Sequence, residues 1–261
     1  MARTRDRVPV SFGPPVPGQV AISHPTRGGL LADLEVRLAV GQGFAVATLN
    51  LDHIVKLRRD AAFGAAYLAQ THVVADGNPV VWLCHLAGHR VELVPGSDLM
   101  APVVALCARM GMPVALVGST DAVLAVAAAR LEAEHPGLRV VARIAPPMGF
   151  DPTGAEACAV LDRVAASGAR VVLLALGAPR QEELAALGRQ RQPGLGFLSI
   201  GAGLDFIAGQ QKRAPVWMRR LALEWLWRLA SNPRRLAVRY AACALALPGL
   251  ARQALRQRRA A

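Results

Sequence analysis

The sequence predicts an α/β protein with a Rossmann-like, mainly parallel sheet between helices, followed by a basic helical C-terminal appendage. Two observations predict the sheet: short apolar runs alternate with segments of helical periodicity, and those runs are apolar on both faces. The distribution of charge predicts the appendage, because twelve of the 30 Lys and Arg residues but only one of the 18 acidic residues lie from Lys212 onward. We therefore expect a proline-rich leader over residues 1–25, an α/β core over 26–211 and a basic appendage over 212–261.

The first part of the core is expected to contain two strands with helices between and after them. The run 44–50 is β-prone, and residues 52–68 carry helical apolar spacing at Ile54, Val55 and Leu57. The run 71–77 is typical of a strand that ends in an acidic turn. Two further helices are expected over 80–86 and 97–110.

The alternation continues to the end of the core. The run 113–118 predicts a buried strand, and Ser119-Thr120-Asp121 is expected to cap a helix over 122–134. Strands over 138–143, 170–176 and 196–200 are expected to alternate with helices over 154–167 and from Arg180. Residues 215–250 are expected to be helical, with breaks at Pro233 and Pro248.

Composition and motif content exclude several classes of protein. An apolar content of 53% is too high for a wholly disordered chain. The four cysteines form no CxxC pair, which argues against a disulfide framework or a structural zinc site. No run approaches the ~20 apolar residues that span a bilayer, and no long apolar run follows the basic start as in a signal peptide. Neither GxGxxG nor a Walker A motif occurs, which disfavours dinucleotide oxidoreductases and P-loop enzymes. The six histidines show no ligand spacing, so we expect neither a metal nor a cofactor.

Four sequence features fall at expected strand ends, where ligands bind in open parallel sheets. Their glycines let the backbone approach a phosphate, and the helix starts that follow offer free N–H groups. The features are Thr48 with Asn50, Asp76-Gly77, Gly177-Ala178-Pro179-Arg180-Gln181-Glu182, and Gly201-Ala202-Gly203-Leu204-Asp205.

Asp76 is the carboxylate most suited to chemistry. At a strand end it can accept a proton from a hydroxyl nucleophile. Its commoner role would be to cap the helix that starts near Asn78-Pro79. The two later candidates lie in the first turn of a helix, where an acid such as Glu182 is favoured by the helix dipole anyway, whereas Gln181 gains nothing from it.

The basic segment 212–261 implies a polyanionic partner. Its apolar residues Trp217, Leu221, Trp225 and Leu229 have fourfold spacing and predict a stripe along a helix. Arginines that could flank this stripe are Arg213, Arg220, Arg228, Arg235 and Arg239. Such a helix either packs on the core with a solvated basic face or lies on an anionic membrane surface, and the charge excess favours the membrane. Nucleic acid ranks third, because no nucleic-acid-binding motif accompanies the charge.

Several blocks taken together resemble the WecG/TagA/CpsF family of bacterial glycosyltransferases. They keep their order from about residue 44 to 240, roughly three quarters of the chain. The blocks are Thr48-Leu49-Asn50, Ala75-Asp76-Gly77-Asn78-Pro79-Val80-Val81-Trp82, Pro95-Gly96-Ser97-Asp98-Leu99, Gly177 to Glu182, Gly201 to Phe206, and Lys212 to Tyr240.

The resemblance implies an inverting, metal-independent transfer of a sugar from a UDP-sugar to a polyprenyl-diphosphate-linked sugar. The enzyme would be cytoplasmic and peripheral on the inner face of the bacterial membrane, and would serve synthesis of an exopolysaccharide, capsule or envelope glycan. The donor sugar would be of the N-acetylmannosamine type or a related hexose or uronic acid.

The resemblance also assigns roles to residues. Asp76 would be the general base, Thr48 and Asn50 would line the pocket, Gln181 would lie near the transferred sugar and diphosphate, and Asp205 would lie at the nucleoside. Other substrate-binding residues would be Gly77, Gly177, Pro179, Glu182, Gly201 and Gly203. Arginines offered to diphosphates would be Arg213, Arg220, Arg228 and Arg235.

Three features depart from the family pattern. Leu93 stands where many members carry an arginine, and Asn78-Pro79 changes the usual DGxG turn. Arg252, Arg256, Arg258 and Arg259 extend the basic segment beyond that pattern, as an added electrostatic anchor would. Two readings from other classes stay open: a nucleotide-sugar-binding module without catalysis, and a nucleic-acid-binding protein.

Overall fold

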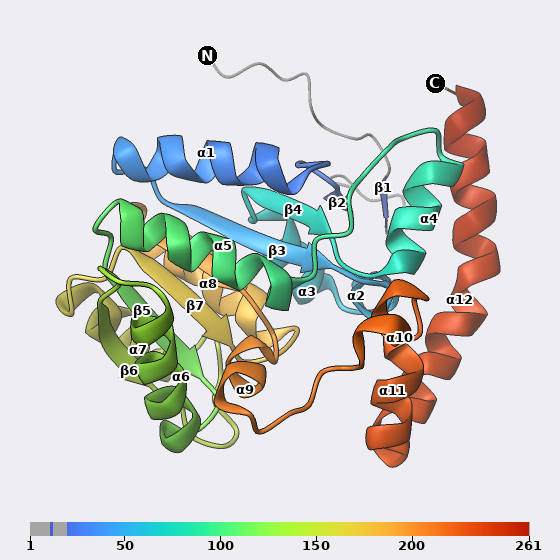
Figure 1. Ribbon diagram of the computed structural model, residues 1–261. Coiled ribbons are helices and arrows are strands. Elements are labelled where there is room, and N and C mark those ends of the chain that lie inside the picture. The colour runs from blue at the N-terminus through green and yellow to red at the C-terminus, as the bar shows by residue number, and fades with distance from the viewer. Residues whose placement is uncertain (1–10, 13–19, 261) are drawn as a thin grey trace.

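A computed structural model describes residues 11–12 and 20–260 of the chain (Figure 1). Its centre is a six-stranded sheet in the order β4-β3-β8-β7-β5-β6, in which every neighbouring pair is parallel. A second, antiparallel pair joins β1 to β2. The predicted α/β fold with a mainly parallel sheet is confirmed. The strands are β1 Ser11–Phe12, β2 Val20–Ala21, β3 Phe44–Leu49, β4 His72–Ala75, β5 Val114–Gly118, β6 Val140–Ile144, β7 Val171–Ala175 and β8 Gly196–Ser199.

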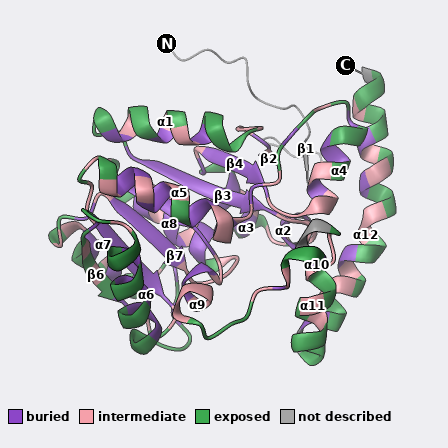
Figure 2. Ribbon diagram, in the orientation of Figure 1, coloured by how far each residue is buried: buried purple, intermediate pink, exposed green. Residues whose placement is uncertain are grey.

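Helices cover both faces of the sheet, and its central strands are therefore buried on both sides (Figure 2). This burial explains why these strands are apolar along their whole length. Along β3, Phe44 and Val46 pack with α1, α5, α6 and α9, while Ala45 and Ala47 face the helices of the other side. The helices of the core are α1 Arg27–Ala39, α2 Leu51–Leu57, α3 Ala61–Leu68, α4 Asn78–Leu86, α5 Gly96–Arg109, α6 Asp121–Glu134, α7 Ala155–Ala166, α8 Arg180–Arg191 and α9 Gly203–Ala208.

Two helical elements near the start of the core differ from expectation. The single helix expected over 52–68 is two helices, α2 and α3, because the Asp60 side chain accepts the N–H of Phe63 and starts a new helix there. Helix α1 was not expected at all. It begins at the N-cap Thr26 and buries Leu30, Leu34 and Leu38, which stand at the i, i+4 spacing of an amphipathic helix.

The leader predicted for residues 1–25 takes part in the core where the structure describes it. Val20 and Ile22 are buried with β3 and β4, and the backbone N–H of Ser23 donates to the carbonyl of Val73 at 2.9 Å. This contact covers part of the outer edge of β4. Residues 1–10 and 13–19 lie outside the described part of the chain.

The C-terminal segment forms three helices: α10 Val216–Arg220, α11 Glu224–Ser231 and α12 Pro233–Ala260. The break expected at Pro233 is confirmed, since this proline is the first residue of α12. The break expected at Pro248 is wrong. Pro248 lies inside α12 on an exposed face, and beyond it Leu250 and Ala254 pack against the core, so burial offsets the cost of the proline.

The apolar stripe predicted along one helix is also wrong. A turn separates α10 from α11, and within it Ala222 adopts a positive φ of 60°. Trp217 and Trp225 therefore belong to different helices, and Leu221 lies in the turn between them. Figure 1 shows α12 running along α4 at one side of the molecule, with α10 and α11 beside it.

Candidate active site

The carboxyl ends of β3 and β4 bring Thr48 and Asp76 together. Because Thr48 pairs in register with Val74, two residues before Asp76, both side chains project to the same face of the sheet. The Thr48 hydroxyl donates to Asp76 Oδ2 at 3.2 Å. The backbone N–H of Gly96, the first residue of α5, is close enough to lower the pKa of the same carboxyl group. A Cβ at Gly96 would lie 3.1 Å from the carbonyl oxygen of Ser199 and 3.2 Å from Thr48 Oγ1, so this position favours glycine.

The surroundings of Asp76 shift the pKa of its carboxyl group. Burial raises its pKa to about 6, against the opposing effects of the Thr48 hydrogen bond, the Arg228 charge and the Gly96 N–H; Glu224 adds to the rise. The carboxylate does not cap α4, because the N-cap of that helix is Gly77 and the cap has no side-chain hydrogen bond. The capping alternative is therefore wrong, and the carboxylate is available for other contacts.

Asn50 belongs to a chain of hydrogen bonds that ends at the backbone of Thr48, the residue whose hydroxyl bonds to Asp76. Its Oδ1 accepts the N–H of His53, and its amide nitrogen lies 3.2 Å from Nε2 of His53. Nδ1 of His53 lies 2.7 Å from the Tyr67 hydroxyl, which in turn donates to the carbonyl of Thr48 at 3.3 Å. Burial lowers the pKa of His53 to about 3, so the ring is neutral, and this chain of bonds places its proton on Nδ1.

The chain through His53 and Tyr67 was missed by sequence reasoning, which assigned the histidines to structural or solvated positions. The structure gives His53 a structural role, since it fixes the backbone at Thr48 through Tyr67. Its position three residues after Asn50 on one helix was the only signal; nothing in the sequence pointed to Tyr67.

Gln181 and Glu182 join the loops that follow β7 and β8. Gln181 Oε1 accepts the N–H of Gly201 at 3.1 Å, and its amide nitrogen donates to Glu182 Oε1 at 2.8 Å. Glu182 has no exposed surface, and burial raises its pKa to about 8, so it is mainly protonated at neutral pH. The Glu182 side chain thus orients the Gln181 amide. A contact between Glu182 and substrate stays a prediction.

Asp205 lies at a second polar group, near the carboxyl end of β5. The Ser119 hydroxyl donates to Asp205 Oδ1 at 2.7 Å, and Gln211 donates to Oδ2 at 3.1 Å. Ser119 adopts a positive φ of 53°, a conformation that is uncommon outside glycine and that clusters at functional sites. The sequence had indicated Ser119 only as part of a helix cap, a role that Thr120 takes.

The predicted glycines shape the loops between these groups. Gly77, Gly177 and Gly201 all adopt positive φ values, of 104°, 71° and 56°, which favour glycine. Gly203 is the first residue of α9, and Pro179 ends the loop that leads into α8.

The four arginines predicted to meet diphosphates have different surroundings. Arg213 pairs with Asp98 at 2.6 Å, donates to Ser97 and lies 5.6 Å from the centre of the Phe206 ring. Arg228 is exposed on α11, close enough for its charge to lower the pKa of Asp76. The side chains of Arg220 and Arg235 lie outside the described part of the structure.

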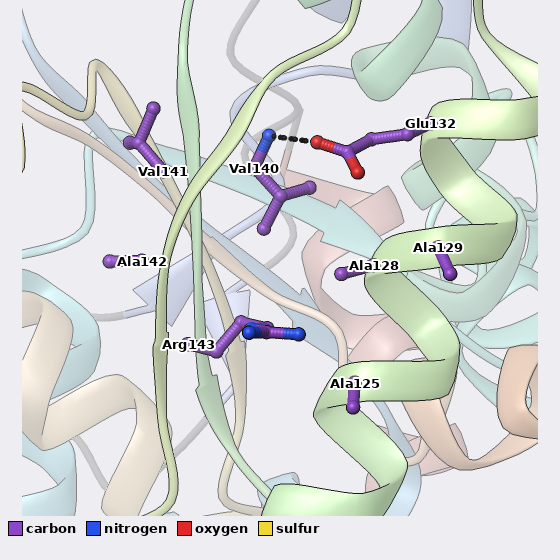
Figure 3. A pocket seen from close by; sticks show the side chains of 8 residues that line it. All are labelled: Ala125, Ala128, Ala129, Glu132, Val140, Val141, Ala142 and Arg143. Atoms are coloured by element: carbon purple, nitrogen blue, oxygen red, sulfur yellow. Dashed lines mark hydrogen bonds between the residues drawn. The ribbon is translucent and has the colours of Figure 1, made fainter.

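Two other features lie away from these groups. A cavity of about 400 Å³ is lined by α6 and β6, the far edge strand from β4, and contains none of the predicted site residues (Figure 3). His24, Asp33 and His72 cluster at the amino end of β4. There Asp33 Oδ2 already pairs with Arg37 at 2.7 Å and His72 at 2.6 Å, which makes this a hydrogen-bonded cluster.

Comparison with known proteins identifies the class. The family model described as "Glycosyl transferase WecG/TagA/CpsF family" matches residues 17–261. The protein is therefore a glycosyltransferase. More particularly, the chain belongs to the WecG/TagA/CpsF family, as the resemblance had indicated. It is 25% identical, over 195 residues that cover 74% of this chain and 73% of the relative, to a Bacillus subtilis (strain 168) protein named N-acetylglucosaminyldiphosphoundecaprenol N-acetyl-beta-D-mannosaminyltransferase.

Proposed function

We propose that this protein transfers a sugar of the N-acetylmannosamine type from a UDP-sugar to a polyprenyl-diphosphate-linked sugar, with inversion and without a metal. Membership of the family and the activity named for the Bacillus subtilis relative support the reaction class. The observation that carries the mechanism is the Asp76 carboxylate, held by Thr48 at the carboxyl edge of the sheet with its pKa raised to about 6. A base with this pKa is deprotonated at neutral pH and still basic enough to accept a proton in the transition state.

In the proposed reaction, Asp76 takes the proton of the acceptor hydroxyl as that oxygen bonds to the anomeric carbon. The bond between this carbon and the UDP oxygen breaks from the opposite face, and its electron pair leaves with the diphosphate. Cations and backbone N–H groups would stabilise the developing negative charge. Arg228, whose charge already acts on Asp76, and the first turn of α9 are the groups we assign to this role.

The second polar group would hold the nucleoside. Asp205 keeps lone pairs for ribose hydroxyls, and Ser119 and Gln211 fix its orientation. Gln181 would contact the sugar or diphosphate between the two groups, since its amide is already oriented by Glu182 and Gly201.

We further propose that the enzyme binds the inner face of the membrane through α4 and α10–α12. These neighbouring elements expose large apolar side chains, among them Trp82 at 52%, Trp217 at 59% and Leu245 at 85%, and they carry most of the excess positive charge. Exposed aromatic and aliphatic groups beside arginines suit an interface with anionic lipids. No helix among the described residues has both the length and the apolar content needed to cross a membrane.

UDP release from a panel of UDP-sugars, with and without polyprenyl-diphosphate-linked acceptor, tests the proposal. We expect turnover that requires the acceptor, persists in EDTA and falls about 10²- to 10⁴-fold in Asp76→Asn. Asp162→Asn is the matched control, because it removes an exposed carboxylate that pairs with Arg191 on the surface. Binding of UDP without turnover of any donor would favour a non-catalytic nucleotide-sugar module, and full activity of Asp76→Asn would remove the assigned base.

A further inference from the structure

Three charged residues that the proposed chemistry does not use form a path between α12 and the loop Gly177–Pro179. Arg239 on α12 pairs with Asp52 on α2, with Nε 3.0 Å from Oδ1. The other carboxylate oxygen of Asp52 lies 2.9 Å from Nζ of Lys56, one turn further along α2. Lys56 in turn donates to the carbonyl oxygen of Ala178 at 3.3 Å. The path is therefore continuous from the C-terminal helix to the loop after β7.

Asp52 is the fixed point of this path. The residue is only 8% exposed, and each of its two oxygens faces a different cation. Removing one partner from a buried ion pair is costly, because it leaves an uncompensated charge in a poorly solvated place. Displacement of Arg239 would thus change the charge balance around Lys56, which also holds the loop.

The Gly177–Pro179 loop fixes the position of Gln181 and Glu182 at the start of α8. The N–H of Gln181 donates to the carbonyl of Gly177, and that of Glu182 to the carbonyl of Pro179, both at 3.1 Å. These bonds set the first turn of α8, and the Gln181 side chain then reaches Gly201. A movement of the Ala178 carbonyl would therefore shift the Gln181 amide.

We propose that Asp52 and Lys56 are positioning residues that make the arrangement of the Gly177–Pro179 loop depend on the docking of α12 against α2. The inference rests on the proposed function in one respect, namely that Gln181 faces the substrates. Helix α12 would then influence the candidate active site without contacting the substrates. When α12 is displaced, the hydrogen bond between Thr48 and Asp76 remains, whereas the Gly177–Pro179 loop loses its contact with Lys56.

The chain provides a matched control for this path. Arg58, the C-cap residue that follows α2, donates to Gln253 of α12 at 3.5 Å. This contact joins the same two helices but does not continue to Ala178. Arg58→Gln therefore removes one contact between the end of α2 and α12 and keeps the Arg239–Asp52–Lys56–Ala178 path intact.

The kinetic test uses the full-length protein with Lys56→Met, Arg239→Gln, the double variant, Lys56→Arg and Arg58→Gln. We expect each of the first two to lower kcat about tenfold with little change in donor KM, as for a coupling between distant groups. The double variant should be no slower than the slower single one, because both substitutions break one path. Lys56→Arg should restore most of the rate, and Arg58→Gln should match wild type. Multiplicative losses in the double variant, or an equal loss in Arg58→Gln, would overturn the inference.

Hydrogen exchange gives a readout that does not depend on transfer activity. The amides of residues 181–183 should exchange faster in Lys56→Met and in Arg239→Gln, and at the wild-type rate in Arg58→Gln. Unchanged exchange in the first two variants would overturn the coupling. If the wild-type protein transfers no sugar but the variants still differ in exchange in this way, the proposed function is wrong and the coupling between α12 and the loop still holds.

Discussion

The surroundings of Asp76 and the C-terminal helices are built in opposite ways. Around Asp76, polar side chains from β3, from the ends of β3 and β4, and from α2 and α3 bond to one another and to the backbone, so the groups are fixed in place before any substrate arrives. Helices α10–α12 instead expose tryptophans, leucines and arginines. The first arrangement suits a reaction that needs fixed geometry, and the second suits contact with a surface that has no fixed geometry. In the function proposed above, the fixed groups would serve the chemistry and the exposed helices would serve binding to the membrane.

Helix α12 blurs this contrast, because one of its faces is buried. Leu250→Ala removes a side chain that is 2% exposed among α4 residues and should lower the free energy of unfolding by about 2–5 kcal/mol. Leu245→Ala, on the exposed face of the same helix, should change it by less than about 0.5 kcal/mol. Denaturant unfolding measures both. Equal effects would mean that α12 does not dock as described.

The charge of the last turns sharpens the contrast in location. Changing Arg256, Arg258 and Arg259 together to Gln should weaken binding to anionic vesicles by about 3 kcal/mol, roughly a hundredfold, without altering the unfolding transition. These three side chains are exposed. The matched control changes three exposed arginines of the core, Arg109, Arg139 and Arg163, and should bind as wild type does. Sedimentation with vesicles gives the answer, and a parallel loss in both triple variants would point to net charge alone.

The smallest expected effect concerns the fixed region. Asp76 works as a base only when deprotonated, so transfer should decline as the pH falls below about 6. The Thr48 hydrogen bond lowers the pKa of Asp76, so Thr48→Val should raise that pKa and move the acid limb of the profile upward by about one unit. Thr48→Ser keeps the hydroxyl and should leave the limb in place. A limb that does not move in Thr48→Val would show that another group controls it.

Local patterns in the sequence predicted the six strands of the parallel sheet and most helices, but not the short pair β1 and β2. Continuous apolar runs of this length are typical of strands in a parallel sheet. Asp76 was located for the same reason, since it ends such a run. Among the elements that were not predicted, α1 is the longest, although its N-cap Thr26 and its buried leucines give it the pattern of an amphipathic helix. The helix expected over 52–68 is divided into α2 and α3 at the Asp60 cap. That cap depends on a hydrogen bond from the backbone N–H of Phe63, which the apolar spacing of the sequence does not reveal.

Contacts between distant segments could not be predicted. The sequence around Asp52 does not indicate Arg239 as its partner, because the two meet only when α12 packs against α2. The sequence around Ser119 does not indicate Asp205, because the two meet only through the fold of the sheet. The break expected at Pro248 failed for a related reason. Whether a helix tolerates a proline depends on the packing of the residues beyond it, here Leu250 and Ala254 against α4.

The strand order has a consequence for the growing chain on the ribosome. β3 pairs on one side with β8, so its partner is translated about 150 residues after it. The apolar faces of α2 and α4 are covered completely only later, once Leu250 and Ala254 of α12 have been made. The core on this side of the sheet is therefore completed only after every strand of the six-stranded sheet has been made.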